Sequence, residues 1–391
     1  MSYPRVPIGD LVSLRQGFAI NKNTKHHISD ESTALPLLRI ADMKDKVQNV
    51  FVKDTIPAHF IAKPEDIIYT RTGQVGLVFT DQYGVIHNNC FTVTPNDAKT
   101  LNRYYLYYVL QSEDFYSAAN NLASGAAQPD LPHGAFRSIE IPVPPLASQM
   151  RIAEILKGYD DLIENNQKQI KLLEEAAQRL YKEWFVDLRF PGHETTPIVD
   201  GVPEGWNRGI LGDIVTETGE KVSKEKRDIF DYYLPIDCLP KKSLGYVTTN
   251  EIKLAESSLV SFAPGDILFG AMRPYFHKVV VARDSGLTRT TCFVLNTPKK
   301  VFWAYAVMLM FSPDTVDYAS QISVGTTMPY TRWKDFKNMP ILIPEESCTC
   351  KFGENVCPII EKINGSAKQV MLLQRARDRL LPKLMSGEIE V

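Results

Sequence analysis

The sequence lacks the features that mark membrane and secreted proteins. It contains no run of 18 apolar residues, so we expect no membrane-spanning helix. The first residues, Met1 to Arg5, lack the apolar segment that a signal peptide contains. The six cysteines are mostly isolated, as in proteins of a reducing compartment, where cysteine acts as a small buried hydrophobic residue. We therefore expect a cytoplasmic protein.

The sequence also lacks a marked excess of positive charge. The formal net charge is −2, residues 1–145 carry 13 Lys and Arg against 14 Asp and Glu, and residues 205–344 carry 17 against 14. Any affinity for nucleic acid must therefore come from local basic faces or from partner subunits. The hydrophobic fraction of 44% is ordinary for a globular protein, and 391 residues are enough for two or more domains.

Signatures of catalysis and metal binding are missing as well. The chain has no Asn-Pro-Pro-Tyr or Asp-Pro-Pro-Tyr tetrapeptide and no Gly-x-x-x-x-Gly-Lys-Ser/Thr phosphate loop. Cys348, Cys350 and Cys357 suggest zinc, but a fourth ligand at a familiar spacing is absent, so zinc is the weaker alternative. The seven histidines do not cluster at ligand spacing. We predict no catalytic residue and no metal site.

A long helix over residues 152–184 is the clearest positive feature. Its apolar residues recur at alternating steps of four and three, which is typical of a seam between two packed helices. This seam consists of Ile152, Leu156, Tyr159, Ile163, Asn166, Ile170, Leu173, Ala177, Leu180 and Trp184. At ~1.5 Å per residue the helix is roughly 50 Å long, more than a small domain needs, so we expect a second helix beside it.

The partner helix is predicted in the same chain, 200 residues further on. The second seam consists of Phe352, Val356, Ile359, Ile363, Ser366, Val370, Leu373, Arg377, Leu380 and Leu384. We predict that the two helices pack as an antiparallel coiled coil along these seams. Asn166 and Arg377 interrupt the apolar pattern and are predicted to set the helix register or to face a partner, since polar seam residues exchange stability for specificity.

The rest of the chain repeats at offsets of 200 to 203 residues. The recurring pairs are Gly9-Asp10 and Gly212-Asp213, Pro64-x-Asp66-Ile67 and Pro264-x-Asp266-Ile267, Cys90-Phe91 and Cys292-Phe293, Gly125 and Gly325, Pro129 and Pro329, Phe136 and Phe336, and Ile141-x-x-Pro144 and Ile341-x-x-Pro344. This order indicates a tandem repeat.

The repeat predicts two α/β (α+β) domains, each followed by a long helix. Their boundaries are 1–145 for the first domain, 146–187 for its helix, 188–205 for a linker, 206–346 for the second domain and 347–391 for the second helix with its tail. Within the first domain a helix is expected from about Asn102 to Leu122. Antiparallel packing of the long helices would give a pseudo-twofold molecule.

The order of these landmarks resembles that of the specificity subunits (HsdS) of type I restriction-modification systems, over essentially the whole chain. The matching features are the Gly-Asp openings, the Pro-x-Asp-Ile strands and the exits at 141–145 and 339–344. The helix text Gln149-x-x-Ile152-Ala153 and the ending Leu381-Pro382-Lys383-Leu384-Met385-Ser386-Gly387-Glu388-Ile389 also match. No single motif is specific, but their order over two repeats is.

The resemblance implies a non-catalytic subunit whose two target recognition domains each read one half of a bipartite double-stranded DNA sequence. It also implies that the helix pair sets the spacing and docks two modification (methyltransferase) subunits, which restriction (translocase/nuclease) subunits join. The complex would be an adenine methyltransferase and ATP-dependent endonuclease. S-adenosylmethionine, ATP and Mg would belong to the partner subunits, and this chain would hold no cofactor.

Polar residues on glycine-bracketed loops are the candidate DNA contacts, because Arg can fork onto guanine O6/N7 and Gln onto adenine N6/N7. The candidates are Thr70, Arg71, Thr72, Gln74, Ser124 and Gln128 in the first domain, and Arg273, Tyr275, His277, Lys278, Thr326, Thr327, Tyr330, Arg332 and Lys334 in the second. We expect Arg71 and Arg273 to occupy equivalent places. For each side chain the alternative is a solvated loop or a strand-pairing residue.

Two other functions remain open from the sequence. The first is a scaffold that binds protein partners through its helices and touches DNA only incidentally. The second is a standalone nuclease or methyltransferase, suggested by Asp314, Asp335 and Lys337 at a magnesium-binding spacing. The matching part of the first repeat lacks the second acid, so we interpret these charges as surface residues.

Overall fold

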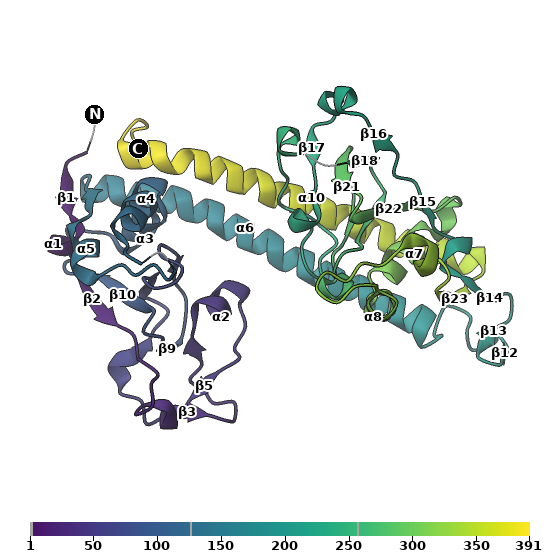
Figure 1. Ribbon diagram of the computed structural model, residues 1–391, viewed down its shortest axis with the longest axis horizontal. Helices are drawn as coiled ribbons and strands as arrows, with labels where there is room; N and C mark the ends of the chain where they lie inside the picture. Colours follow the sequence, from purple (N-terminus) through teal and green to yellow (C-terminus); the bar gives the residue numbers. More distant parts are fainter. Residues whose placement is uncertain (1–2, 126, 256–257) are drawn as a thin grey trace. The chain divides into compact units, whose positions relative to one another are not determined.

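The computed structural model describes residues 3–125, 127–255 and 258–391. The chain divides into two compact units, Met1–Asp161 with Arg375–Val391, and Leu162–Gln374. Two long helices, α6 (Leu146–Tyr181) and α10 (Glu346–Ser386), each contribute one end to the first unit and the other end to the second (Figure 1).

The first unit is built on a four-stranded antiparallel sheet in the order β2-β10-β7-β8. A three-stranded sheet β4-β9-β6 and the pairs β1-β11 and β3-β5 complete it. The strands are β1 Arg5–Pro7, β2 Val12–Gln16, β3 Ile28–Ser29, β4 Leu37–Leu38, β5 Phe51–Val52, β6 Ile61–Ala62, β7 Ile67–Thr70, β8 Val78–Phe79, β9 Gly84–Ile86, β10 Cys90–Pro95 and β11 Glu140–Pro142. The shorter helices are α1 Ile8–Leu11, α2 Ile40–Asp45, α3 Arg103–Gln111, α4 Glu113–Leu122 and α5 His133–Ser138.

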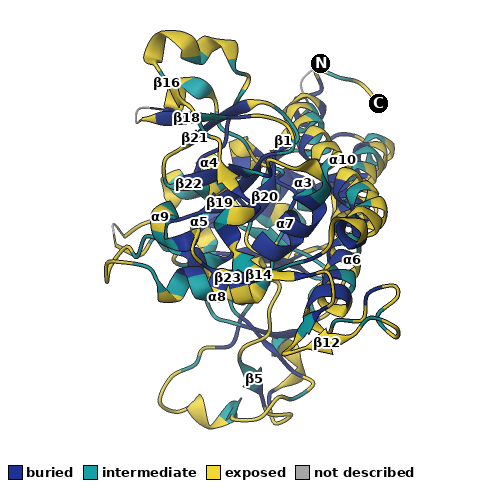
Figure 2. Ribbon diagram, turned by 90° about the vertical axis from the view of Figure 1, so that its right-hand side faces the viewer, coloured by how far each residue is buried: buried dark blue, intermediate teal, exposed yellow. Residues whose placement is uncertain are grey.

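The second unit has a four-stranded sheet β15-β22-β19-β20, a second sheet β16-β18-β21-β17, and the pairs β14-β23 and β12-β13. Its strands are β12 Ile198–Val199, β13 Val202–Pro203, β14 Asn207–Ile210, β15 Thr216–Glu217, β16 Lys221–Val222, β17 Tyr232–Tyr233, β18 Leu259–Phe262, β19 Ile267–Gly270, β20 Val279–Val281, β21 Gly286–Arg289, β22 Cys292–Asn296 and β23 Pro340–Ile343. Its helices are α7 Trp303–Met310, α8 Pro313–Gln321 and α9 Trp333–Phe336. Strands β19 and β20 and helix α7 are almost wholly buried (Figure 2).

The same topology therefore occurs twice, which confirms the repeat predicted from the landmarks. Sheet β2-β10-β7-β8 corresponds to β15-β22-β19-β20, and the pair β1-β11 corresponds to β14-β23. Even the parallel pairing of β4 with β9 has a counterpart in the parallel pairing of β17 with β21.

The helix predicted from Asn102 to Leu122 is two helices, so that prediction was wrong. Ser112 has an extended backbone with ψ 146°, and its Oγ accepts a hydrogen bond from Phe115 N at 3.3 Å. A serine hydroxyl that caps a free backbone N–H starts a new helix, here α4. Ser312 caps α8 in the same way through Thr315 N.

The long helices contribute to a core in each unit. In the first unit the start of α6 and the end of α10 share one core through Ile152, Ala153, Leu156, Leu384 and Met385. In the second unit the other ends share one through Ile170, Ala177, Val356, Ile360 and Ile363, among others.

The buried positions follow the predicted seams with one correction on α10. Ile360 is buried, while the predicted Ile359 is only partly buried against the same core. The step from Val356 is therefore four residues, which suits the 3.6-residue period of the α-helix. Ile163 and Val370 are buried as expected. Tyr159, Leu173, Leu180, Leu373 and Leu380 are partly exposed.

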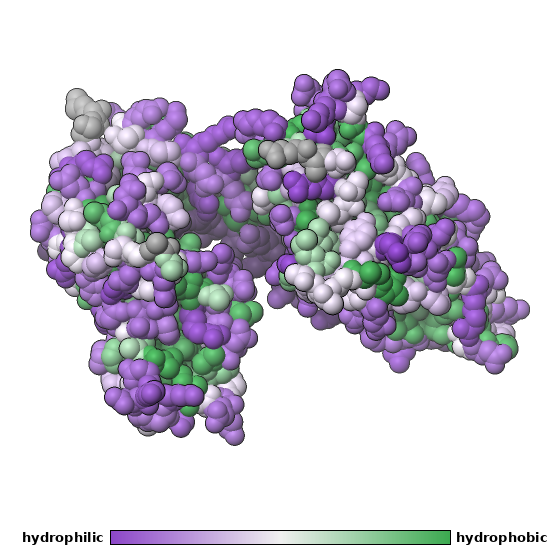
Figure 3. Space-filling model, viewed as in Figure 1, coloured by the Kyte–Doolittle hydropathy of each residue, from purple (hydrophilic) through white to green (hydrophobic). Residues whose placement is uncertain are grey.

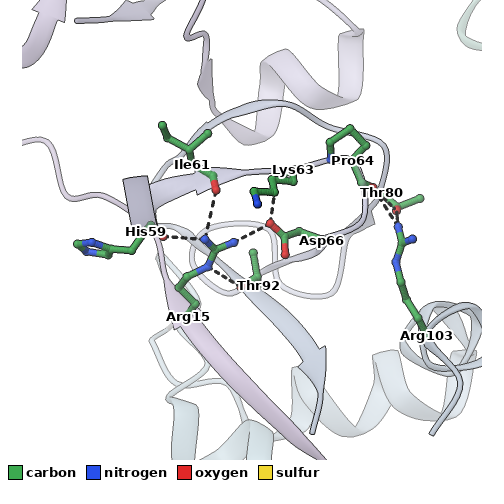
Figure 4. Close-up of polar contacts among 9 residues, drawn as sticks. All are labelled: Arg15, His59, Ile61, Lys63, Pro64, Asp66, Thr80, Thr92 and Arg103. Atoms are coloured by element: carbon green, nitrogen blue, oxygen red, sulfur yellow. Dashed lines mark hydrogen bonds and ion pairs between the residues drawn. The ribbon is translucent and has the colours of Figure 1, made fainter. Parts of the chain in front are cut away.

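Asp66 of the Pro-x-Asp-Ile motif has a structural role. Its Oδ2 accepts from Lys63 N at 2.9 Å and pairs with the Arg15 guanidinium at 2.6 Å. Arg15 also donates to the carbonyl oxygens of His59 and Ile61, so it joins β2 to the β6 segment (Figure 4). Asp266 accepts from Ala263 N at 2.7 Å in the second unit, so the repeated aspartate closes the turn that precedes each central strand.

Helix α6 contacts the rest of the second unit through a buried carboxylate. Glu174 is 6% exposed, and its Oε1 accepts from Ser243 Oγ at 2.6 Å and from Leu244 N at 2.7 Å. Burial raises the pKa of Glu174, although these hydrogen bonds oppose the shift. The turn at Ser243 and Leu244 is thus attached to the helix inside this unit.

Candidate nucleic-acid interface

Two loops of the first unit are joined by backbone hydrogen bonds. Ser124 and Asp130 exchange N–H···O bonds of 2.9 and 2.8 Å, Gly73 N donates to Pro129 O at 2.8 Å, and Leu131 N donates to Arg71 O at 3.0 Å. The predicted segments at 70–74 and 124–128 therefore form one surface, apart from residue 126, which lies outside the described residues.

The second unit builds the same frame from different residues. Val324 and Tyr330 exchange two bonds of 3.0 Å, Arg273 N donates to Pro329 O at 2.7 Å, and Thr331 N donates to Ala271 O at 2.9 Å. Each bond has its counterpart exactly 200 residues earlier in the chain. We call the loops 70–77 with 124–130, and 271–278 with 324–330, the paired loops of the two units.

The frame corrects one predicted equivalence. Because Gly73 and Arg273 donate to matching proline carbonyls, the counterpart of Arg273 is Gly73, and the counterpart of Arg71 is Ala271. Arg71 and Arg273 are therefore not equivalent residues, and the prediction that paired them was wrong.

Arg71 is held by a carboxylate within its own frame. Its Nη2 lies 2.6 Å from Asp130 Oδ2, its Nε donates to Asp130 Oδ1 at 3.2 Å, and Thr72 Oγ1 also donates to Asp130. The Arg71 guanidinium, ahead of the Thr72 hydrogen bond, holds the pKa of Asp130 below its usual value. Arg71 thus links the two loops, and Asp130 offsets much of its charge.

Two predicted DNA contacts are corrected by their burial, and a third is bonded within the protein. Thr70 is fully buried, with Oγ1 accepting from Leu77 N at 2.9 Å. His277 is buried, its Nε2 lies 3.0 Å from Phe311 O, and burial lowers its pKa. Lys278 Nζ donates to Ile236 O at 2.7 Å. The side chains of Thr70 and His277 therefore make hydrogen bonds inside the protein and are not exposed to a ligand, whereas Lys278 is partly exposed.

The remaining candidates lie at or near the surface. Gln74, Ser124, Gln128, Tyr275, Thr326, Thr327, Arg332 and Lys334 are exposed, and Thr72, Arg273 and Tyr330 are partly exposed. Arg332 pairs with Asp335 at 2.7 Å, and Tyr330 Oη donates to Thr290 O at 3.3 Å. The pairing of Asp335 accounts for one acid of the nuclease-like spacing.

Sequence reasoning missed three residues of the paired loops. Asp130 holds Arg71, and Val324 and Met328 are 57% and 59% exposed although they are apolar. Their position in the sequence could have identified them, because segments 124–130 and 324–330 contain the repeated glycine and proline. The face seen in Figure 3 is mostly hydrophilic, with hydrophobic residues in separate small patches.

The structure describes residues 3–125, 127–255 and 258–391. In these ranges no three His, Cys, Asp or Glu side chains form a group that could hold a metal ion. Cys348 is buried, Cys357 is partly buried and Cys350 is exposed, all as free thiols. No helix in this described part of the chain is long and apolar enough to span a membrane.

Known proteins with a related sequence agree with this duplicated arrangement of sheets and paired loops. Residues 3–175 match the family model of the type I restriction modification DNA specificity domain. The type I restriction enzyme MjaIX specificity subunit of Methanocaldococcus jannaschii is 29% identical over 83% of this chain and 78% of its own length. The MjaVIII specificity subunit of the same organism is 23% identical over 99% of this chain and 92% of its own length.

A solved structure extends the agreement to the fold. The crystal structure of a type I restriction-modification system S subunit from M. genitalium matches with a TM-score of 0.64 over 98% of this chain and 96% of that chain, at 16% sequence identity. The two chains therefore share one architecture. Residues 3–175 thus match the type I restriction modification DNA specificity domain, and the chain is similar over nearly its whole length to type I restriction enzyme specificity subunits.

Proposed function

We propose that this chain is the DNA sequence-specificity subunit of a type I restriction-modification complex, and that each unit reads one half of a bipartite double-stranded target. The observation that carries the proposal is the frame of the paired loops. Both units build it from the same backbone hydrogen bonds, yet they display Gln74, Ser124 and Gln128 in one case and Arg273, Tyr275 and Thr327 in the other. A constant backbone with different side chains suits two readers of different sequences.

The long helices are proposed to separate the two readers as an antiparallel pair. Supporting this, the start of α6 packs with the end of α10 in one unit, and their opposite ends pack together in the other. A rod of this kind holds two binding modules at a defined spacing along a duplex. We also propose that the helices dock two modification subunits, which restriction subunits join.

The chain itself is proposed to be non-catalytic and to hold no cofactor. Adenine methylation with S-adenosylmethionine, and cleavage with ATP and Mg, would be carried out by the partner subunits. The chain's part is to supply the base and phosphate contacts that select the site.

The test is to express the chain with its modification subunits in a host without other adenine methyltransferases and to map methylated adenines by long-read sequencing. The expected result is one motif of two specified halves joined by a spacer of constant length. Replacing this chain with an unrelated specificity subunit should change the motif. Methylation without sequence preference, together with equal binding of the complex to random and target DNA, would favour a protein scaffold instead.

A further inference from the structure

The loop from Arg273 to His277 contains two strained backbone positions. Arg273 and His277 have φ of 51° and 52°, in the left-handed region where a side chain crowds the backbone. In the first unit the position of Arg273 is occupied by Gly73, with φ 85°. Glycine accepts this conformation without steric cost, so the second unit carries a strain that the first avoids.

The surroundings hold this strained loop in place. Arg273 N donates to Pro329 O at 2.7 Å, His277 Nε2 faces Phe311 O at 3.0 Å, and Lys242 N donates to His277 O at 2.8 Å. Pro274, at the start of the intervening 3-10 turn Pro274–Phe276, is buried. Strained residues persist where neighbours over-determine them, and they concentrate at binding sites.

The charge of Arg273 is not balanced within the protein. Its Nη2 donates only to the carbonyl of Thr327, at 3.3 Å, and no carboxylate among the described residues lies within ion-pair distance. Arg71, in contrast, forms an ion pair with Asp130, which offsets much of its charge. Arg273 Nη1 and the second hydrogen of Nη2 therefore remain available to an electronegative partner, and the held loop fixes the direction in which the side chain leaves the backbone.

Exposed apolar side chains lie on the same paired loops as this arginine. Tyr275 is 53% exposed, and Val324 and Met328, on the loop that accepts the Arg273 hydrogen bonds, are 57% and 59% exposed. Arginine beside exposed aromatic and methionine side chains is typical of the centre of an interface. On duplex DNA such apolar groups can contact the methyl group of thymine, while arginine forks onto guanine O6 and N7.

We infer that Arg273 is the specificity-determining residue of the second unit and that it reads a guanine in the half-site of that unit. The inference rests on the proposed function. Guanine fits better than a backbone phosphate, because the exposed Tyr275 and Met328 on the same loops offer apolar groups that suit base edges and not a phosphate. A fork aimed at two acceptors needs arginine in a defined orientation, and this is what the strained backbone provides.

The experiment compares Arg273→Gly, Arg273→Lys and wild type in the complete complex with modification subunits. Adenine methylomes give the motif, and thermal unfolding of the purified chain gives its stability. With Arg273→Gly we expect a higher unfolding temperature, since glycine removes the strain, and relaxed selection at one guanine of one half-site. Methylation of that site relative to its variants should fall roughly 5- to 150-fold. Arg273→Lys should relax the same position.

The control is Arg208→Ala, which removes an exposed arginine of β14 outside the paired loops and should leave the motif unchanged. An unchanged motif with Arg273→Gly or Arg273→Lys overturns the inference, and so does uniform weakening at all bases, which is the behaviour of a phosphate contact. If Arg273→Gly fails to fold, Arg273→Asn, which tolerates the left-handed backbone, replaces it. Loss of all sequence preference in the wild-type complex would instead refute the proposed function.

Discussion

Arg377 Nη1 lies 2.5 Å from Asp160 Oδ1, so an ion pair joins α10 to α6 within the first unit. Asp160 Oδ2 also accepts a hydrogen bond from Tyr108 Oη at 2.7 Å, which ties the same carboxylate to α3. Burial, together with this bond, raises the pKa of Tyr108. Arg377 interrupts the apolar seam because it has a specific partner on the facing helix.

We predict that Arg377→Ala lowers the free energy of unfolding by roughly 1–3 kcal/mol, because it leaves a largely shielded carboxylate with one partner fewer. Urea denaturation of the purified chain measures the change. Arg379→Ala on the same helix is the control, since Arg379 is exposed and should shift stability by less than about 0.5 kcal/mol. Equal effects of the two substitutions would show that the pair with Asp160 contributes nothing particular.

Glu174 gives a prediction for pH dependence. Burial raises the pKa of its carboxyl above the unfolded value of 4.5, so the folded state binds the proton more tightly than the unfolded state. The stability that this group contributes is therefore fully present below about pH 4.5 and declines as the pH rises through the folded pKa. Glu174→Gln keeps an acceptor for Ser243 and Leu244 without the buried charge.

The expected result is that Glu174→Gln raises the unfolding temperature at pH 8 and has a smaller effect at pH 5. Glu174→Ala should lower it at both values, because the buried N–H of Leu244 loses its acceptor at a cost of roughly 1–3 kcal/mol. Differential scanning calorimetry at the two pH values is the measurement. If Glu174→Gln raised the unfolding temperature equally at pH 5 and pH 8, the raised pKa of the Glu174 carboxyl would be contradicted.

Gly73 tests backbone conformation separately from packing. A Cβ built at Gly73 meets no atom within 4 Å, yet φ is +85°. Gly73→Ala should therefore destabilise the chain by roughly 1–2 kcal/mol through the left-handed backbone alone. Gly134 in α5 also has open space but no positive φ, so Gly134→Ala should be neutral or stabilising by up to about 1 kcal/mol. Chemical denaturation of both variants measures the change in the free energy of unfolding. Similar changes in the two variants would mean that the positive φ of Gly73 does not cause the destabilisation.

The helix pair gives a prediction about the DNA spacer. Since Glu174 anchors the second domain, an added turn belongs at the boundaries between the units, after Asp161 and after Gln374. Four residues at each place add roughly 6 Å and about one helical turn. At ~3.4 Å per base pair, the spacer between unchanged half-sites should lengthen by one or two base pairs. Methylome sequencing shows the spacing, and an unchanged spacer would mean that the helices do not determine it.

The repeat and the turns at 124–130 and 324–330 could be predicted from the sequence, because glycine alone accepts a left-handed backbone without steric cost and proline has a fixed φ. Gly125 with Pro129, and Gly325 with Pro329, marked the same turn twice. The predicted equivalence of Arg71 and Arg273 was wrong because it relied on both residues being arginine. The equivalent positions are those whose backbone groups make the same hydrogen bonds, and these are Gly73 and Arg273. Thr70 looked like a loop residue, but it is the last residue of β7, and its hydroxyl turns inward.

The long helices were partly predictable for a related reason. Apolar residues that recur at alternating spacings of four and three residues identify a packed helix face. The pattern does not show where two spacings of four follow each other, as they do from Phe352 through Val356 to Ile360. Glu174 is polar and lies between seam positions, so nothing in the pattern indicated that Ser243 and Leu244 bind it. Contacts between distant segments depend on docking geometry, which the local sequence does not contain.

The frame of the paired loops is made by main-chain atoms, so it places few demands on the side chains that it carries. Gln128 and Met328, or Ser124 and Val324, can stand at matched positions because the bonds at Asp130 and Tyr330 run through their N–H and C=O groups. Substitutions at these four positions should therefore change the ligand contacts of the loops with little effect on the stability of the fold. If the loops read DNA as proposed, single substitutions on them would let a lineage move between DNA targets while the backbone frame is retained.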